Sequence, residues 1–563
     1  MRSAVSQQIG SRIILDKIFN RHTSFQLEVA HQLRNDVKAG ALTRREVLKR
    51  GSALGLSLGL LGGLLGFEKP VLAQETPKQG GVLKLGIARP RGVVDPLTSR
   101  SRSEGFVLKP VLPPLGRLQA DGSLSPGLAE SWAPSADATT WTFKFRPTKW
   151  ISGEAFTAHD IAAALDILLD PASPSPTVSG YRGILSHGNY EVPDDQTLVF
   201  HLDRPYVDFP YIVSYGATAW FPKGYAQGDF AKGTVGGVGP FLLKEYSADR
   251  GATYVKNPDY WDAANIHLDG LEIVFFDDDQ SMALALQGGQ VDALPVLASS
   301  AVLAISANPD FEVLSARSSA YNSIRMQVDT EPFTDKRVRQ ALAYAIDRQA
   351  IVNTIYGGAA DLGNDHVFAP AFLQSAVVND AIPQRTRDVA KARQLLADAG
   401  HAGGLKLTLT SQQYADIPQY LQLVQSQAKE AGFDITLDLK SQAEYYGADA
   451  NQPWLSVPFG ATDWGERATP GAMITPAYLT GAPFNESKYA SAEFDAAAKA
   501  FDAEIDPAKR GQLAIDAAKI MHEDTPAIIG YFAQTRRPVN RKVRGFPAGP
   551  ASQLDLTGTW LDA

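Results

Sequence analysis

The chain has 563 residues, too many for one small domain at about 100–200 residues each, and 44% of them are hydrophobic against 20% charged. This composition excludes disorder along the whole length. The net charge is −8, but residues 1–73 hold 11 Lys and Arg against 5 Asp and Glu, so the remaining residues carry an excess of 14 negative charges. So acidic a body disfavours binding to nucleic acid or to anionic lipid. Cysteine is absent, which excludes thiol nucleophiles, Cys-ligated metals and disulfides.

The first segment has the pattern of an export signal. Arg44 and Arg45 precede a short, Gly-rich apolar run, 53–67, and small residues end the segment at Ala73. Fifteen residues are too few to span about 30 Å of hydrocarbon. Paired arginines before a weakly apolar run are typical of the twin-arginine type, with cleavage after Ala73 and a mature chain from about Gln74. An uncleaved membrane anchor is the alternative, and residues 1–42 are long for a signal.

The first part of the mature chain is predicted to be rich in strands. Apolar runs and strict alternation predict strands at 81–87, 141–145, 197–202 and 271–276, with a helix over 158–169. Asp277, Asp278 and Asp279 follow the last of these strands, but the calcium-loop positions that require Gly and Glu hold Met282 and Gly288. We therefore expect a solvated turn there.

The second part is predicted to contain more helix. Apolar residues at helical spacing predict one helix that begins after Thr334 or Asp335 and ends at Gly357. Alternation at 405–409, a helix over 416–430 and alternation again at 433–439 predict a βαβ unit with parallel strands. Near the end, a helix begins at Asp506-Pro507, and 527–532 reads as one buried strand. The mature chain is therefore predicted to be α/β.

No motif indicates an enzyme. Residues 55–59 fit the G-x-S-x-G pattern of a nucleophile elbow, but they lie inside the export signal with no strand before them. The mature chain has seven histidines and no HxxxH or HExxH spacing, so surface or capping roles are expected for each. We expect neither a catalytic residue nor a metal ligand nor a cofactor.

Several stretches resemble family 5 of the bacterial extracellular solute-binding proteins, the dipeptide- and oligopeptide-binding components of ABC importers. The resemblance runs from about residue 80 to residue 561. It is carried, in family order, by 122–132 with 140–146, by Gly239-Pro240-Phe241 with Asn257-Pro258-Asp259-Tyr260-Trp261 and 285–292, and by Asn322 with Pro332-Phe333, 337–342 and 345–348. Most of these residues are expected to be structural: turns at 239–241 and 257–258, core aromatics at Tyr260 and Trp261, and surface ion pairs for Arg337, Arg339 and Arg348.

The resemblance implies a two-lobed periplasmic binding protein fold of the α/β class, with a hinge that the chain crosses twice. After the signal and N-terminal extension at 1–73, the first lobe is expected over 74–318, with an extra subdomain at about 106–230. The second lobe is expected over 319–531, and residues 532–563 return to the first.

The resemblance also implies where the ligand binds. Asp463 takes the place of the carboxylate that meets a peptide ammonium, at the end of a strand that includes Gly460 and Ala461. Trp464 can stack on the ligand, and Arg467 can pair with its carboxylate. Tyr445, Asn485 and Tyr531 lie where the family places cleft residues. Beyond Asp463, however, the sequence departs from the Asp-Pro-rich run usual in peptide binders.

The predicted function is capture of a peptide or peptide-like solute by a periplasmic monomer, whose partners are the permease and ATPase subunits of an importer. The membrane is reached only through the permease. An oligosaccharide, an opine-like conjugate or a metal chelate on the same scaffold is the first alternative. A secreted hydrolase and a receptor subunit that passes its ligand to a sensor are the others.

Overall fold

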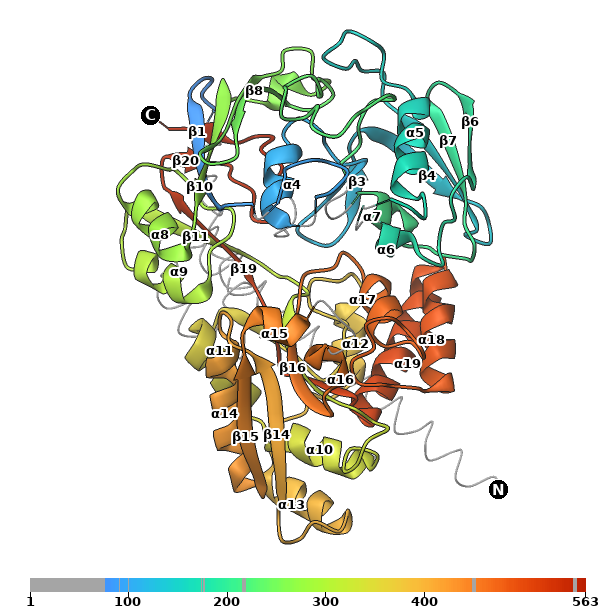
Figure 1. Cartoon of the computed structure of the whole chain (residues 1–563), viewed down its shortest axis with the longest axis vertical. Coiled ribbons are helices and arrows are strands. Elements are labelled where there is room, and N and C mark those ends of the chain that lie inside the picture. Colours follow the sequence, from blue (N-terminus) through green and yellow to red (C-terminus); the bar gives the residue numbers. More distant parts are fainter. Residues whose placement is uncertain are drawn as a thin grey trace, which may run out of the picture. The chain divides into compact units, whose positions relative to one another are not determined.

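The computed structural model describes residues 76–562, except 91, 100, 174, 176–177, 215–218, 448–451 and 550–553. The predicted export signal, with Arg44, Arg45, the 55–59 motif and the cleavage site after Ala73, lies outside the described residues. The described chain forms the α/β, two-lobed fold that the sequence predicts (Figure 1).

The first lobe is built on a four-stranded sheet of order β1-β10-β9-β8. Its strands are β1 (Val82–Ala88), β8 (Phe241–Ser247), β9 (Gly251–Lys256) and β10 (Gly270–Phe276). β1 and β10 are parallel, although 181 residues separate their ends, and the other pairs are antiparallel. Helices α4 (Arg102–Leu108), α8 (Asp279–Gln287) and α9 (Ser299–Ser306) belong to the same lobe, and exposed Asp278 caps α8.

A second sheet, of order β4-β5-β7-β6, is inserted between β1 and β8 in the chain. Its strands are β4 (Ala129–Pro134), β5 (Thr140–Phe145), β6 (Tyr190–Asp194) and β7 (Thr197–His201), accompanied by the short hairpin β2 (Gly116–Leu118) and β3 (Leu124–Pro126) and by helices α5 (Ala158–Leu168), α6 (Val178–Tyr181) and α7 (Phe209–Ser214). One apolar core extends under both sheets of this lobe, and Tyr260 lies in it as expected.

The second lobe is built on a five-stranded sheet of order β15-β14-β16-β12-β17. Its strands are β12 (Tyr321–Met326), β14 (Leu405–Gln412), β15 (Phe433–Lys440), β16 (Phe459–Trp464) and β17 (Ala527–Ile529). Helix α14 (Ile417–Glu430) joins β14 to the parallel strand β15, so the predicted βαβ unit is confirmed. The remaining elements of the lobe are α10 (Lys336–Ala345), α11 (Arg348–Tyr356), β13 (Ala360–Leu362), α12 (Ser375–Ala381), α13 (Val389–Asp398), α15 (Gln442–Tyr446), α16 (Pro453–Ser456), α17 (Pro470–Ala477), α18 (Ala492–Ala503) and α19 (Pro507–Asp524).

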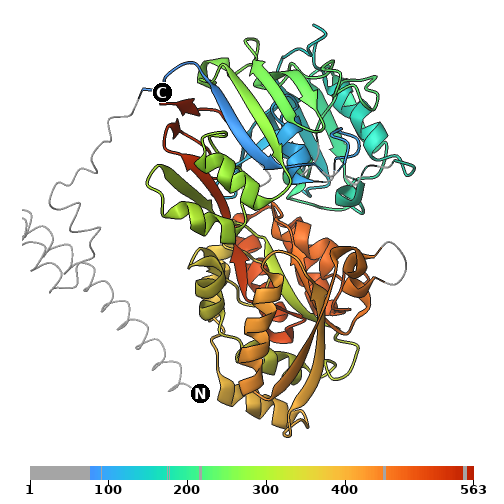
Figure 2. The same cartoon turned by 60° about the vertical axis from the view of Figure 1, so that its left-hand side comes forward.

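Two antiparallel segments connect the sheets of the lobes (Figures 1 and 2). Strand β11 (Phe311–Ala316) pairs with β19 (Thr535–Asn540), and the chain continues from β11 into β12 and reaches β19 from β18 (Tyr531–Ala533). Val539, near the end of β19, and Val543 and Phe546 beyond it join the core of the first lobe. The chain ends with the short pair β20 (Val543–Arg544) and β21 (Trp560–Leu561).

Two expected elements are each divided in two. The helix predicted from Asp335 to Gly357 is α10 and α11, because Ile346 adopts an extended conformation and the Asp347 side chain caps a new helix. Gly357 ends α11 with φ 59°, the left-handed conformation that favours glycine. The single strand predicted over 527–532 is β17 and β18, which pair in different sheets because the chain passes from one to the other at Gly530.

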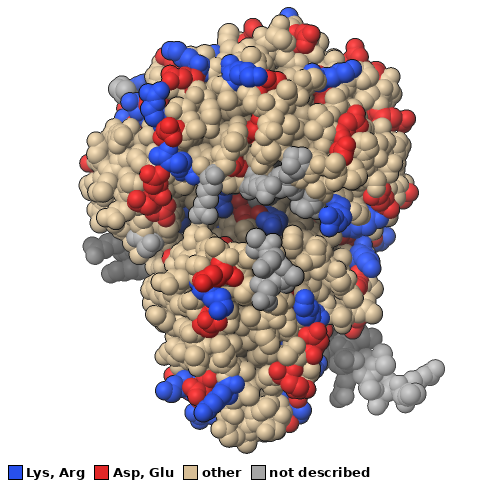
Figure 3. Space-filling view, in the orientation of Figure 1, with Lys and Arg blue, Asp and Glu red and all other residues tan. Residues whose placement is uncertain are grey.

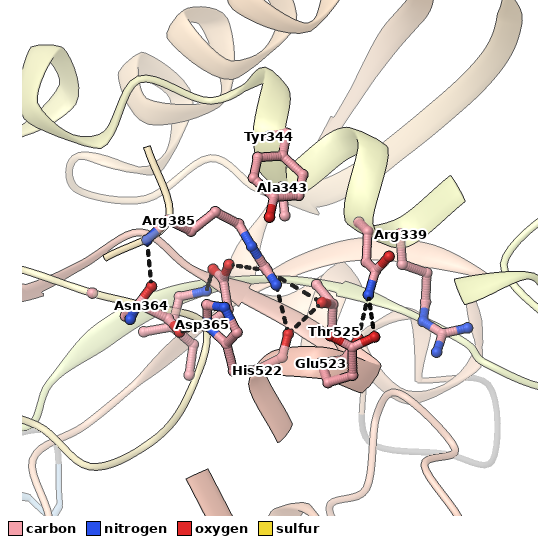
Figure 4. A network of polar contacts seen from close by, with 12 residues as sticks. Arg339, Ala343, Tyr344, Asn364, Asp365, Arg385, His522, Glu523 and Thr525 are labelled. Atoms are coloured by element: carbon pink, nitrogen blue, oxygen red, sulfur yellow. Dashed lines mark hydrogen bonds and ion pairs between the residues drawn. The ribbon is translucent and has the colours of Figure 1, made fainter. Parts of the chain in front are cut away.

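Three side chains expected at the surface are buried. Arg337 pairs with Asp335 at the surface, as predicted, but Arg339 is only 5% exposed and Arg348 only 3%. Arg348 meets Asp365. Arg385 meets the same carboxylate (Figure 4). His366 is also buried, at 1% exposure, and burial lowers its pKa to about 4. The arginine side chains enter this core because carbonyl groups and carboxylates meet their guanidinium groups there.

Candidate functional site

Strands β14, β15 and β16 run in the same direction, so their carboxyl ends meet at one edge of the sheet. In open α/β sheets, ligands bind outside this edge. Gln412 ends β14, the short helix α15 follows β15, and Asp463 lies at the end of β16. On the face drawn in Figure 3 the surface is hollowed between the upper and lower parts, and acidic and basic side chains lie in the hollow.

The Asp463 side chain is held from one side only. Its Oδ1 accepts hydrogen bonds from Gln412 Nε2 and from the Tyr446 hydroxyl, and Gln442 Nε2 donates to Gln412 Oε1 at 2.9 Å. Burial, and then the negative charge of Asp463, raise the pKa of Tyr446 far above its usual range, so this hydroxyl remains a donor. No described residue donates to Oδ2, and Asp463 is partly exposed. The carboxylate is therefore fixed in orientation with one oxygen left to accept.

Asn322 completes this edge from the neighbouring strand. The register of β12 and β16 sets Asn322 directly opposite Asp463, so their side chains leave the same face of the sheet. Asn322 Nδ2 donates to the Tyr531 hydroxyl at 2.6 Å, and Tyr531 packs against Tyr356 and Tyr420 with ring centroids 5.0 and 5.3 Å away. The predicted residue Tyr531 is fully buried, so Asn322 stands between it and the edge.

Gly460 and Ala461 are built into the sheet. A Cβ on Gly460 would lie 2.8–2.9 Å from the guanidinium of Arg325, so only glycine lets this side chain cross the strand. The carbonyl of Ala461 accepts from Ser411 Oγ at 2.6 Å and from the Tyr445 hydroxyl at 2.9 Å. Tyr445 is thus fully buried beneath the strand, and its neighbour Tyr446 is the residue that reaches Asp463.

Trp464 and Asn485 are also turned inward. The Trp464 indole donates to Glu486 Oε1 at 2.9 Å, and Glu486 lies 3.7 Å from the guanidinium of Arg325. Burial raises the pKa of Glu486, against the opposing effect of Arg325. The Asn485 side chain bridges the backbone of Leu479 and Tyr489 and so fixes a turn.

Arg467 lies beside the segment that connects the lobes. Its backbone N–H donates to Ser319 Oγ at 2.8 Å, and its carbonyl accepts from the same hydroxyl at 2.8 Å. Its guanidinium donates to the carbonyls of Gly465 and Glu466 through Nη1 alone, at 3.1–3.2 Å. The remaining guanidinium N–H groups have no partner among the described residues, and the side chain is half-buried.

The structure therefore places Asp463 at the carboxyl edge of the second-lobe sheet and Arg467 beside the segment that connects the lobes, with the other predicted residues behind them. Sequence reasoning missed Gln412 and Tyr446. The available signal was their position: Gln412 is the last residue of β14 and Tyr446 lies shortly after β15, and both strands run in the same direction as β16. Among the described residues, no group of His, Cys, Asp and Glu is arranged to hold a metal ion. No helix in the described part is long and apolar enough to cross a membrane.

Residues 123–486 match the family described as bacterial extracellular solute-binding proteins, family 5. Dipeptide-binding protein DppE of Bacillus subtilis is 26% identical over 488 residues, which cover 81% of this chain and 87% of the relative. Periplasmic binding protein DppA of Helicobacter pylori, solved with the peptide STSA, matches 86% of this chain and 99% of its own with a TM-score of 0.70 and 21% identity. AgaA of Agrobacterium tumefaciens, solved with agropinic acid, covers the same shares with a TM-score of 0.67 and 24% identity.

The chain therefore belongs to family 5 of the bacterial extracellular solute-binding proteins. The family consists of binding proteins that act outside the cytoplasm as components of ABC importers, whose permease and ATPase subunits are their partners.

Proposed function

We propose that this solute-binding protein captures a peptide or peptide-like solute between its two lobes and delivers it to the permease of an ABC importer. The observation that carries the proposal is the Asp463 carboxylate, which is oriented through Oδ1 and has no described donor at Oδ2. An ammonium group is a fitting partner, because it brings the charge and the donors that a half-satisfied carboxylate lacks.

Arg467 supplies the opposite charge four residues away. Its guanidinium can pair with a ligand carboxylate in two-pronged fashion through the groups that the described chain leaves unengaged. Asn322 and the end of β16 then lie beside the extended main chain of the ligand, whose amide groups can form hydrogen bonds whatever its side chains are. A ligand with both an ammonium and a carboxylate, as in a short peptide, satisfies both residues together.

Binding couples to closure of the lobes, with the hinge at β11 and β19 and the boundaries near residues 318 and 531. A ligand that touches both lobes stabilises the closed form, which the permease recognises. Mass spectrometry of the solute that co-purifies with the protein tests the ligand class. A co-purifying solute without an amine would contradict the peptide proposal. The purified solute should also reduce the radius of gyration in small-angle scattering, and unchanged dimensions at saturation would contradict closure.

Export as a folded monomer through the twin-arginine route completes the proposal. It is supported by Arg44 and Arg45, the weakly apolar run after them and the small residues up to Ala73. Replacing both arginines with lysine should abolish the periplasmic pool, as measured by fractionation, and the mature N-terminus of the parent should lie close to Gln74. Undiminished periplasmic protein in the double variant would contradict the twin-arginine route.

A further inference from the structure

Away from the connecting strands β11 and β19, the lobes touch on elements other than those that carry Asp463. The segment after β7, residues 202–208, belongs to the first lobe and meets the end of α18 and the start of α19 in the second. Arg204 Nη1 lies 3.1 Å from Asp502 Oδ2, and Arg510 Nη2 lies 2.7 Å from Asp208 Oδ2. The backbone N–H of Val207 donates to the carbonyl of Asp502 at 2.8 Å. Each lobe thus contributes one cation and one anion, and the two ion pairs run in opposite directions.

These charges are buried by the contact itself. The side chains of Asp208 and Asp502 are 4% and 5% exposed, that of Arg510 is 10% exposed and that of Arg204 is 27% exposed. An ion that loses its water needs its partner, and removal of one member leaves the other uncompensated. Separation of the lobes returns all four groups to water. The pair of Arg510 and Asp208 is therefore stabilising only while both members are present and the lobes are in contact.

Each half of the contact is fixed from within its own lobe. On the first lobe, the backbone of Tyr206 is tied to Ala138, and the Trp141 indole donates to its carbonyl at 3.2 Å. On the second, Arg510 Nε donates to the carbonyl of Phe501 at 3.2 Å, and its guanidinium lies 4.3 Å from the centre of the Phe501 ring. Because both halves are held in place, little side-chain freedom is lost when they meet.

Gly471, near the start of α17, leaves room for Asp502 of its own lobe and for Tyr206 of the first lobe. A Cβ at this position would lie 2.4 Å from Asp502 Oδ1 and 3.0 Å from the Tyr206 hydroxyl. Its backbone is not in the left-handed region, so the restriction comes from the space and not from the conformation. Three helices of the second lobe, α17, α18 and α19, thus contact the segment 202–208 of the first lobe.

We propose that Arg204, Asp208, Asp502 and Arg510 form a latch between the lobes that sets the ratio of closed to open protein before any ligand binds. This proposal depends on the proposed function in one respect: the latch acts on the closure of the lobes, which is part of that function. It acts on ligand affinity indirectly, because a population already biased toward the closed form leaves less of the closing free energy for the ligand to supply.

The test measures the two populations in ligand-free protein. Because the chain has no cysteine, Gln196→Cys in the first lobe and Lys519→Cys in the second introduce two unique and exposed labelling positions. Spin labels on them report the distribution of distances between the lobes. Arg510→Gln and Asp208→Asn should each lower the ratio of closed to open protein about tenfold or more. The double variant should fall by less than the product of the single effects, because no unpaired charge remains.

Arg117→Gln is the matched control, since Arg117 pairs with Asp555 at 3.2 Å within the first lobe. It should leave the distribution unchanged. Arg204→Gln, the most exposed member, provides a variant with little risk to folding. Latch variants that fold like the parent and keep its distance distribution would overturn the proposal. Since no ligand is present, that result would leave the role of Asp463 and of import untouched.

Discussion

Two carboxylates of the second lobe lie in opposite surroundings. Asp365 is fully buried, and both its oxygens are occupied: Arg348 Nη2 reaches them at 2.8 and 2.6 Å, Arg385 Nη1 at 2.5 Å and the N–H of Ile529 at 3.1 Å. Asp463 is partly exposed and uses one oxygen. A charge that its own chain satisfies completely holds the fold together and offers nothing to a ligand. A charge that is oriented but half-satisfied is prepared to bind.

Asp365→Asn should have the largest effect, and on stability. Burial opposes ionisation of Asp365, but Arg348 and Arg385 outweigh it and hold its pKa below the usual range. Loss of the charge leaves two buried guanidinium groups uncompensated, which should lower the free energy of unfolding by about 3–5 kcal/mol. Chemical denaturation measures it. Asp335→Asn is the control, because Asp335 forms an exposed pair and asparagine also caps a helix, so the change should be under about 1 kcal/mol.

Asp463→Asn should do the reverse, with little change in stability and a large loss of binding. Removing one partner of a buried charge pair costs about 2–5 kcal/mol, which is roughly 30- to several-thousand-fold in Kd. N-acetylation of the co-purified ligand should weaken binding to the parent and have much less effect on the variant. Calorimetry on these four combinations measures both. If the variant bound the free-amine ligand as tightly as the parent, Asp463 would be a structural residue, and its proposed difference from Asp365 would be wrong.

A smaller effect is expected from the donors that orient Asp463. Tyr446→Phe removes one of its two hydrogen bonds without changing the shape of the ring, and a hydrogen bond to a charged group contributes about 1.5–3 kcal/mol. Ligand affinity should fall about tenfold or more. Tyr445→Phe is the neighbouring control: its hydroxyl bonds to Ala461, so stability should fall while affinity holds. A larger loss of affinity in Tyr445→Phe than in Tyr446→Phe would favour the role in the cleft that the sequence predicts for Tyr445.

Features that depend on one continuous stretch of sequence could be predicted, whereas contacts between distant segments could not. The βαβ unit follows from alternation and helical spacing in one continuous stretch, so the sequence is sufficient to predict it. The break between α10 and α11 was missed because the apolar spacing continues from Ala345 to Val352 across an extended Ile346. The burial of Arg348 depends on Asp365, Arg385 and carbonyl groups that arrive from distant loops, and the periodicity of a helix carries no information about them.

Asp463 was predicted through a family resemblance, whereas its partners were not. Gln412 lies 51 residues before it, and only the order of strands in the sheet brings the two together. The ion pairs of the latch were missed for the same reason, since 298 residues separate Arg204 from Asp502. Charges that meet across a contact between lobes look like ordinary surface charges in the sequence.

The surroundings of Asp502 are intermediate between those of Asp365 and Asp463. The smallest expected effect, a dependence of closure on pH, comes from this residue. It is buried like Asp365, but Oδ1 has no hydrogen-bond partner. Burial, supported by the charge of Asp208 and opposed by Arg204 and Arg510, raises its pKa to about 7. The other group against it, Tyr206, stays neutral because burial raises its pKa well above the usual range.

When the lobes separate, Asp502 regains water and its pKa falls toward the ordinary value of about 3.9. The closed form therefore binds a proton more readily than the open form. Its advantage is complete below the lower pKa and disappears as the pH rises through about 7. The closed fraction of ligand-free protein, measured with the same pair of spin labels, should thus increase as the pH is lowered from 8 to 6. Asp502→Asn should keep the closed fraction independent of pH over this range. An equal pH dependence in the parent and in Asp502→Asn would assign the titration to another group, and Asp502 would then belong with Asp365 as a purely structural charge.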